Sequence, residues 1–205
     1  MKVVGDLRKG AQGMNRTQRR SQAIQEERTE TFLKHVTLTG KGESIRVGNI
    51  SYDGRAKRSR LICVGDHVTL NHGVSLLVHD ALGLFHDGRM KYGKIILEPF
   101  VNIGTHSILL PGIRIGRGSL VAAGSVVYSG TDIPPREVWG GNPARKLCSL
   151  DKYLEKRKAQ PARTRKSGIA PLETILGPPS KGLAEVFEEG MKASSGQESE
   201  TEPIP

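Results

Sequence analysis

The chain has 205 residues, of which 36% are hydrophobic and only 4% aromatic, and its formal net charge is +10. This length suits one domain with tails, the two cysteines exclude a disulfide framework, and no apolar stretch reaches the ~20 residues of a membrane span. There is no signal-peptide segment near Met1, so we expect a cytoplasmic protein, and the basic balance suits an anionic partner.

The predicted elements begin with a polar arm, residues 1–34, in which the pattern over residues 17–34 predicts a helix. From residue 35 to residue 147 short strands with regularly spaced glycines are expected. A hexapeptide unit repeats through this region, and an internal repeat of this kind defines the fold. The unit is an aliphatic residue, a small or acidic one, any two, a small residue or valine, and any one. Full units begin at Val47, Val64, Leu97, Ile103, Ile115 and Val121.

The six-residue period predicts a triangular prism. Three units make one coil, so residues eighteen apart stack, with Leu97 over Ile115 and Ile103 over Val121. The aliphatic residue fills the narrow interior, the glycine after it is expected to allow a tight corner, and each strand pairs with the coils above and below. We therefore expect an all-β parallel helix with an apolar column, in which Cys63 is a core residue.

Residues 80–95 interrupt the rhythm and contain Gly83, Gly88 and Gly93. The hexapeptide phase before this segment does not continue after it, which predicts a loop that leaves the prism. Long loops on a rigid scaffold tend to carry function. His79 stands where the repeat ends and the loop begins, a position that suits a general base. A polar corner residue bonded to a neighbouring coil is an equally weighted reading of the same position.

The repeats are followed by a segment, residues 133–147, that must cap the prism. It combines Gly140-Gly141, which permits close approach of a ligand to the backbone, with Arg145 and Lys146, which supply charge for a phosphate. A C-terminal helix is expected within residues 148–159. Residues 160–205 are expected to be a basic and then acidic tail, largely disordered.

The run from Ile103 to Val127, followed by Gly141-Asn142-Pro143-Ala144-Arg145, resembles the hexapeptide-repeat acetyltransferases over roughly residues 45–147. The tripeptide Val78-His79-Asp80 is most similar to the sugar and exopolysaccharide O-acetyltransferases of that family. The resemblance implies a left-handed parallel β-helix with an excursion loop, a homotrimer, acetyl-CoA as co-substrate and no metal. The left hand of the helix rests on the resemblance alone.

The resemblance also implies roles for individual residues. His79 matches the family's catalytic histidine before its excursion loop. Asn49 matches, by spacing, an acceptor-binding asparagine of the family. Asp80 and His86, which lie in the loop, are further candidates for acceptor binding. The implied cofactor-binding residues are Thr105, Ala123, Tyr128 and Ser129 along the pantetheine groove between subunits, and Gly141, Pro143, Arg145 and Lys146 at the adenine and phosphate end. Many relatives carry Thr-Lys in place of Tyr128-Ser129, so one cationic contact is missing here.

The function implied is acetylation of a hydroxyl on a sugar or polysaccharide precursor, a small-molecule or glycan acceptor, with peripheral membrane association left open. One alternative is a zinc enzyme similar to γ-class carbonic anhydrases, for which His79 and His106 are available without a third histidine at matching spacing. Another is a non-catalytic scaffold whose basic tails bind a partner. No stacking platform or recognition motif accompanies the basic residues, so nucleic acid is not an expected partner.

Overall fold

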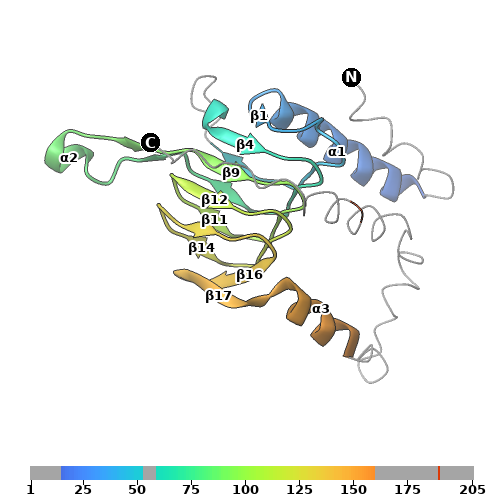
Figure 1. Ribbon diagram of the computed structural model, residues 1–205. Coiled ribbons are helices and arrows are strands. Elements are labelled where there is room, and N and C mark those ends of the chain that lie inside the picture. The colour runs from blue at the N-terminus through green and yellow to red at the C-terminus, as the bar shows by residue number, and fades with distance from the viewer. Residues whose placement is uncertain (1–14, 53–58, 160–188, 190–205) are drawn as a thin grey trace. The chain divides into compact units, whose positions relative to one another are not determined.

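The computed structural model describes residues 15–52, 59–159 and 189 (Figure 1). The chain divides into two units, Met1–Leu150 and Asp151–Pro205, and all the strands described below belong to the first. The expected tail, residues 160–205, lies outside the described residues except for Glu189. Among the described residues, no helix combines the length and the apolar character of a membrane span.

The first helix, α1 (Arg16–Leu33), begins at a capping box. The Asn15 side chain accepts a hydrogen bond from the Gln18 backbone N–H at 2.9 Å, and the Gln18 side chain accepts from the Asn15 N–H at 2.8 Å. The helix is mostly polar, but Thr29 and Phe32 are buried, and Thr29 Oγ1 accepts from the Val47 N–H at 3.3 Å. The predicted helix over residues 17–34 is confirmed, and it is docked onto the first coil.

Parallel strands form three faces of a prism, and the chain visits the faces in turn (Figure 1). Face A consists of β1 (Thr37–Leu38), β4 (Ile62–Val64), β9 (Ile95–Leu97), β12 (Ile113–Ile115) and β15 (Asp132–Ile133). Face B consists of β2 (Arg46–Val47), β5 (Thr69–Leu70), β10 (Asn102–Ile103), β13 (Leu120–Val121), β16 (Glu137–Gly141) and the antiparallel β17 (Ala144–Ser149). Face C consists of β3 (Ser51–Tyr52), β6 (Ser75–Leu76), β11 (Ile108–Leu109) and β14 (Val126–Val127). One strand from each face makes a coil, and the fold is a parallel β-helix.

The strand register confirms the predicted stacking, because Leu97 pairs with Ile115 and Ile103 pairs with Val121. The aliphatic residues that open the full hexapeptide units are at most 3% exposed: Val47, Val64, Leu97, Ile103, Ile115 and Val121. They form one continuous apolar column inside the prism. The hexapeptide phase therefore identifies the core.

The expectation that Cys63 is a core residue is wrong, because it lies on the outer surface of face A and is only half-buried. Its strand neighbours Ile62 and Val64 are both buried, and alternate residues of a strand point to opposite faces. An apolar sequence run therefore does not place every member in the core. Partial burial raises the pKa of the Cys63 thiol above its ordinary value, against a smaller lowering by Lys94.

The small residue after each buried aliphatic also has a different cause from the one expected. Gly104 does not have a positive φ; instead, a Cβ built there would lie 2.4 Å from the Ala123 backbone nitrogen in the next coil. The positive φ occurs two residues later, at His106 (57°), and its counterpart one coil on is Gly124 (68°). The small residue thus serves the close approach of two coils, not the tight turn.

The interruption predicted at residues 80–95 is confirmed as an arm that projects from the prism (Figure 1). It consists of β7 (His79–Asp80), the one-turn helix α2 (Leu84–Asp87) and β8 (Lys91–Tyr92), with β7 antiparallel to β8. Leu82 and Phe85 near its tip are 88% and 95% exposed. The arm is therefore a small ordered hairpin, and we call residues 79–92 the arm below.

The β16–β17 hairpin closes face B at the end opposite to β2. Its turn contains a cis peptide bond between Asn142 and Pro143. The Leu150 N–H donates to the Arg136 carbonyl at 2.8 Å, and Leu150 is buried. The C-terminal helix, α3, spans Leu150–Ala159 and nearly all of it belongs to the second unit.

Candidate functional site

The root of the arm holds His79 in a defined position. His79 pairs with Tyr92 across the two arm strands, with ring centroids 6.1 Å apart and an interplanar angle of 35°. The Gly93 N–H donates to the Val78 carbonyl at 3.1 Å, and a Cβ on Gly93 would lie only 2.3 Å from the Gly112 backbone nitrogen. The base of the arm therefore packs closely against the backbone of the next coil. The His79 Nδ1 atom is buried.

The two other predicted residues of the arm lie in different surroundings. The Asp80 carboxylate accepts a hydrogen bond from the Leu82 N–H at 2.8 Å, so it stabilises the turn that leaves β7. His86 is exposed on α2, beyond that turn. Asn49 lies elsewhere, at the corner between face B and face C of the first coil, where its carbonyl accepts from the Gly73 N–H. One chain does not bring these three acceptor-binding candidates together.

The predicted pantetheine-binding residues are divided between the two edges of face C. Thr105 and Ala123 lie at the corner between face B and face C, and Tyr128 and Ser129 lie at the corner between face C and face A. His79 begins the arm at this second corner. The strands of face C and their turns separate the two edges by about 15 Å at ~3.3 Å per residue. Within one chain, these four candidates therefore lie on opposite edges of face C.

The predicted phosphate end lies on the terminal hairpin. Gly141 has a φ of 99°, which favours glycine, and its N–H donates to Ser125 Oγ at 3.2 Å. Pro143 occupies the exposed turn that follows. Arg145 is exposed, and one of its guanidinium nitrogens donates to the Ala144 carbonyl at 2.9 Å. Its remaining donors are available to a ligand phosphate.

Lys146 differs from Arg145 because its ammonium group forms an ion pair with Glu137 across the hairpin. The Trp139 indole N–H donates to the same carboxylate at 2.7 Å. Burial raises the pKa of Glu137, but the hydrogen bonds from Lys146 and Trp139 outweigh it and lower the pKa below its ordinary value. A ligand phosphate would have to compete with Glu137 for Lys146.

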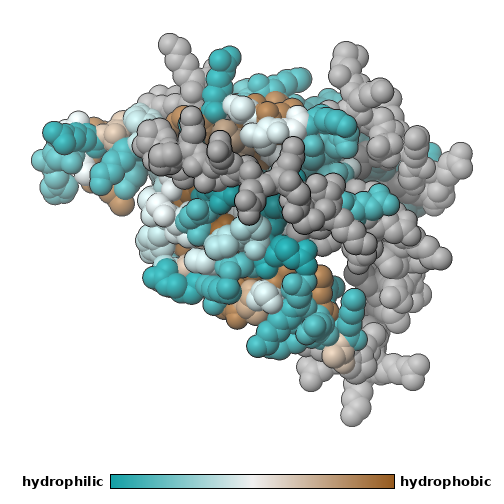
Figure 2. All heavy atoms as spheres, in the orientation of Figure 1, coloured by the Kyte–Doolittle hydropathy of each residue, from teal (hydrophilic) through white to brown (hydrophobic). Residues whose placement is uncertain are grey.

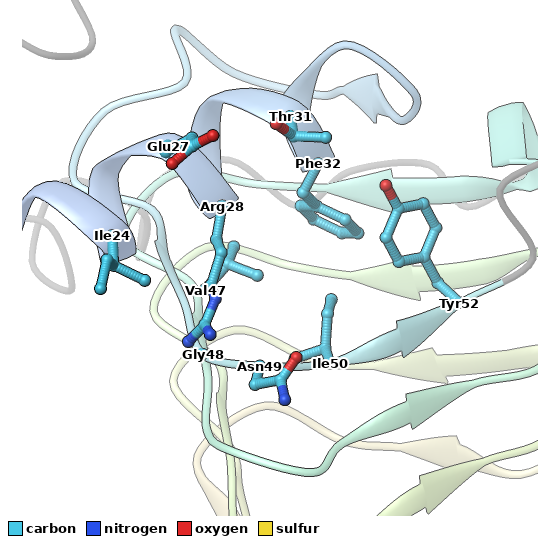
Figure 3. A pocket seen from close by; sticks show the side chains of 10 residues that line it. All are labelled: Ile24, Glu27, Arg28, Thr31, Phe32, Val47, Gly48, Asn49, Ile50 and Tyr52. Carbon is cyan, nitrogen blue, oxygen red and sulfur yellow. The ribbon is translucent and has the colours of Figure 1, made fainter.

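A cavity of about 380 Å³ lies between α1 and the first coil (Figure 3). Its walls are formed by Ile24, Glu27, Arg28, Thr31, Phe32, Val47, Gly48, Asn49, Ile50 and Tyr52. Asn49 was expected to bind the acceptor, but the contribution of α1 was missed, because the helix was interpreted only as part of a polar arm. Its spacing carried a signal: Ile24 and Phe32 lie two turns apart on one side of an otherwise polar helix.

Histidines also meet at the corner between face B and face C, where the His72 and His106 rings contact edge to face with centroids 5.5 Å apart. His79 lies at a different corner. Among the described residues of one chain, no three His, Cys, Asp or Glu side chains are grouped so that they could hold a metal ion.

No protein-family model matches the chain, but curated proteins do. It is 33% identical over 97 residues to Bacillus subtilis YvoF, named as an unproven acetyltransferase, covering 47% of this chain and 53% of that protein. It is 39% identical over 103 residues to Staphylococcus aureus CapG, covering 47% and 57%. It is 32% identical over 114 residues to Arabidopsis thaliana mitochondrial gamma carbonic anhydrase 1, covering 54% and 36%. The match thus spans between about a third and just over half of these relatives.

Among solved structures, a maltose O-acetyltransferase of Clostridium difficile is 28% identical, with a TM-score of 0.47 over 61% of this chain and 75% of that chain. A galactoside acetyltransferase in complex with coenzyme A is also 28% identical, with a TM-score of 0.43 over 58% and 62%. By its own strand register the chain is a hexapeptide-repeat β-helix. Several of its relatives are named as acetyltransferases, so the predicted resemblance is confirmed.

Proposed function

We propose that the chain is a cytoplasmic acetyl-CoA-dependent O-acetyltransferase whose acceptor is a hydroxyl of a sugar or polysaccharide precursor. The observation that carries the proposal is the placement of His79. It is held at the root of the arm by β7–β8 pairing and by the contact of Gly93 with the next coil. A general base must be held in place in this way, because its efficiency depends on geometry before pKa.

In the proposed reaction, the acceptor oxygen attacks the thioester carbonyl while His79 takes the hydroxyl proton. We assign this proton to Nε2, because Nδ1 is buried. The carbon–sulfur bond then breaks, the imidazolium returns its proton to the leaving thiolate, and the products are an acetyl ester and free coenzyme A. Removing the proton in step with attack avoids a free alkoxide, and such catalysis contributes roughly 10²–10⁴-fold.

We further propose a homotrimer with each site shared by two subunits. The support is the division of the candidate residues between the two edges of face C: one copy would present His79 and Tyr128, and its neighbour Thr105 and Ala123. Face C carries small or apolar outward residues, Ser75, Ile108 and Val126, between these edges. Cyclic closure would use each such face once and leave no open surface.

The test compares His79→Ala with a matched control, His67→Asn, in assays of thiol release from acetyl-CoA with a panel of sugars. His67 lies at a different corner with a φ of 58°, which asparagine tolerates. We expect His79→Ala to lower kcat by roughly 10²–10⁴-fold with an unchanged melting temperature, and the control to stay near wild type. Activity of His79→Ala within a few-fold of wild type would contradict the assignment of His79 as the general base.

The similarity to a gamma carbonic anhydrase over 114 residues favours one second candidate, a zinc enzyme. Metal analysis of the purified protein, combined with a carbon dioxide hydration assay, separates the two functions. Stoichiometric zinc and hydration activity without thiol release would replace the acetyltransferase proposal. A thermal shift with coenzyme A separates the acetyltransferase from a non-catalytic scaffold.

A further inference from the structure

The cavity between α1 and the first coil contains a cation that the proposed chemistry does not use. Arg28 extends from α1 toward Gly48 and Asn49, whereas the Glu27 carboxylate is directed away from Asn49 (Figure 3). Within residues 15–52 and 59–159, the Arg28 guanidinium forms no ion pair. The coil-side end of the cavity is therefore positively charged and can accept a carboxylate or phosphate in the fork geometry that guanidinium favours.

Asn49 adds a neutral hydrogen-bonding group beside this cation. Its backbone carbonyl is used by Gly73, but its side-chain amide, exposed and lining the cavity, has no partner in the part of the chain that the structure describes. An amide offers both donors and an acceptor. Together, Arg28 and Asn49 suit a ligand that carries an anionic group and hydroxyl groups close together.

The opposite wall of the cavity is apolar and rigid. Phe32 and Tyr52 contact edge to face with ring centroids 5.1 Å apart, and the Tyr52 hydroxyl is 3.2 Å from His35 Nδ1, which fixes the ring. Ile50 points into the space between them and Asn49 (Figure 3). Phe32 is almost fully buried, so the half-buried Tyr52 and Ile50 provide the surface that can cover the apolar face of a sugar ring. The volume of about 380 Å³ lies in the range of small-ligand pockets.

We propose that this cavity binds a sugar that bears a carboxylate or a phosphate. Arg28 would bind the anionic group, and Asn49 would form a hydrogen bond with a neighbouring hydroxyl. The inference rests on the proposed function in one respect, that the bound sugar is the acetyl acceptor. Asn49 lies on the edge of face C opposite to the arm, so in the proposed trimer the arm of an adjacent copy would supply the base.

Titration calorimetry of the full chain without acetyl-CoA tests the site directly. The ligands are glucose, glucuronate, glucose 1-phosphate and inorganic phosphate, so that carboxylate and phosphate are separated. We expect one or both charged sugars to bind at least tenfold more tightly than glucose, with an affinity that falls at high salt. Inorganic phosphate should bind more weakly than glucose 1-phosphate, because it cannot use the aromatic wall.

Three variants assign the binding to the named residues. Arg28→Gln should weaken binding of the charged sugar by roughly ten- to a hundredfold. Arg20→Gln, which removes the same charge from an exposed position of α1 outside the cavity, should leave binding unchanged. Asn49→Asp keeps the size of the side chain but repels an anion, so it should weaken the charged sugar selectively. Circular dichroism and melting curves establish that each variant is folded.

The outcomes separate this inference from the proposed function. His79→Ala should lose acetyl transfer but still bind the charged sugar, because His79 is not part of the cavity. If no acetyl transfer is found at all, a loss of binding in Arg28→Gln and not in Arg20→Gln would still support the site. Equal binding of glucose and its charged derivatives, equal effects of the two arginine substitutions, or no binding of any sugar would each overturn it.

Discussion

The coils over residues 95–141 are regular, whereas the part of the molecule before them, residues 16–94, is not. In the regular part, paired strands of face A are eighteen residues apart, as Leu97 and Ile115 are. Before it, the paired residues Val64 and Leu97 are thirty-three apart, because the arm intervenes. The same offset relates Leu70 to Ile103, so the ladder is preserved across the insertion.

The difference shows how a repeat scaffold accommodates a site. An insertion at a corner leaves the pairing of every face in register, so it does not disturb the apolar column. The candidate base His79 and the cavity residues Arg28 and Asn49 all belong to the irregular part. The candidate cofactor residues, by contrast, lie on the corners and cap of the regular coils. The period builds the framework, and in the proposed function the irregular segments carry the specific chemistry.

The largest effect is expected from a charge placed in the apolar column of the regular coils. Ile103→Asp places a carboxylate at a position that is 0% exposed, and we expect it to cost more than about 4 kcal/mol, enough to prevent folding. The matched control is Asn102→Asp, on the exposed side of the same strand. Circular dichroism melting should show an unfolded Ile103→Asp and a near-normal Asn102→Asp. A cooperative transition in the core variant would mean that the hexapeptide phase is misassigned.

A smaller effect should separate the two kinds of glycine in the regular coils. Gly104→Ala would bring a Cβ to 2.4 Å from the Ala123 backbone nitrogen, and we expect a loss of about 3 kcal/mol in unfolding free energy. Gly130→Ala meets no atom within 4 Å but has a φ of 78°, which costs only about 1–2 kcal/mol. Denaturant unfolding measures both. Equal losses would contradict the steric explanation of the small residue after each aliphatic.

The arm allows the irregular part to be changed alone. Asp80 and Lys91 are paired across its strands, so replacing residues 81–90 by Asn-Gly should close a two-residue hairpin turn. We expect the melting temperature to stay within a few degrees, and acceptor turnover to fall on the order of a hundredfold through lost positioning. Coenzyme A binding, followed by thermal shift, should persist. Collapse of the fold would show that the arm is part of the framework after all.

The smallest expected effects concern the cap. Arg145→Ala should raise the KM for acetyl-CoA by roughly tenfold, because one charge-assisted phosphate contact is lost. Lys146→Ala should have less effect, since Lys146 is paired with Glu137. Glu137→Gln, which frees that lysine, should lower the KM if Lys146 reaches the phosphate. Kinetics at low and high salt measure all three, and an unchanged KM in Arg145→Ala would refute the assigned contact.

The sequence by itself determined the framework, because its signals are local or periodic. The six-residue period selected Leu97, Ile103, Ile115 and Val121 as core residues, and all are buried. The phase break located the arm. A polar stretch predicted α1 within a residue at each end. The roles of His79 and of the cofactor-binding residues came from local position and charge and from the resemblance, and they stay predictions.

Only the tertiary structure decided what depends on contacts between distant segments. It placed Cys63 on the outer surface of face A, explained Gly104 by the backbone of the next coil, and paired Lys146 with Glu137 across a hairpin. It also docked α1 onto the first coil, which joins Arg28 and Asn49 in one cavity. These two residues are far apart in the sequence, and no local pattern records their distance. The docking of a mostly polar helix through Thr29 and Phe32 created the cavity, and only three-dimensional packing specifies that arrangement.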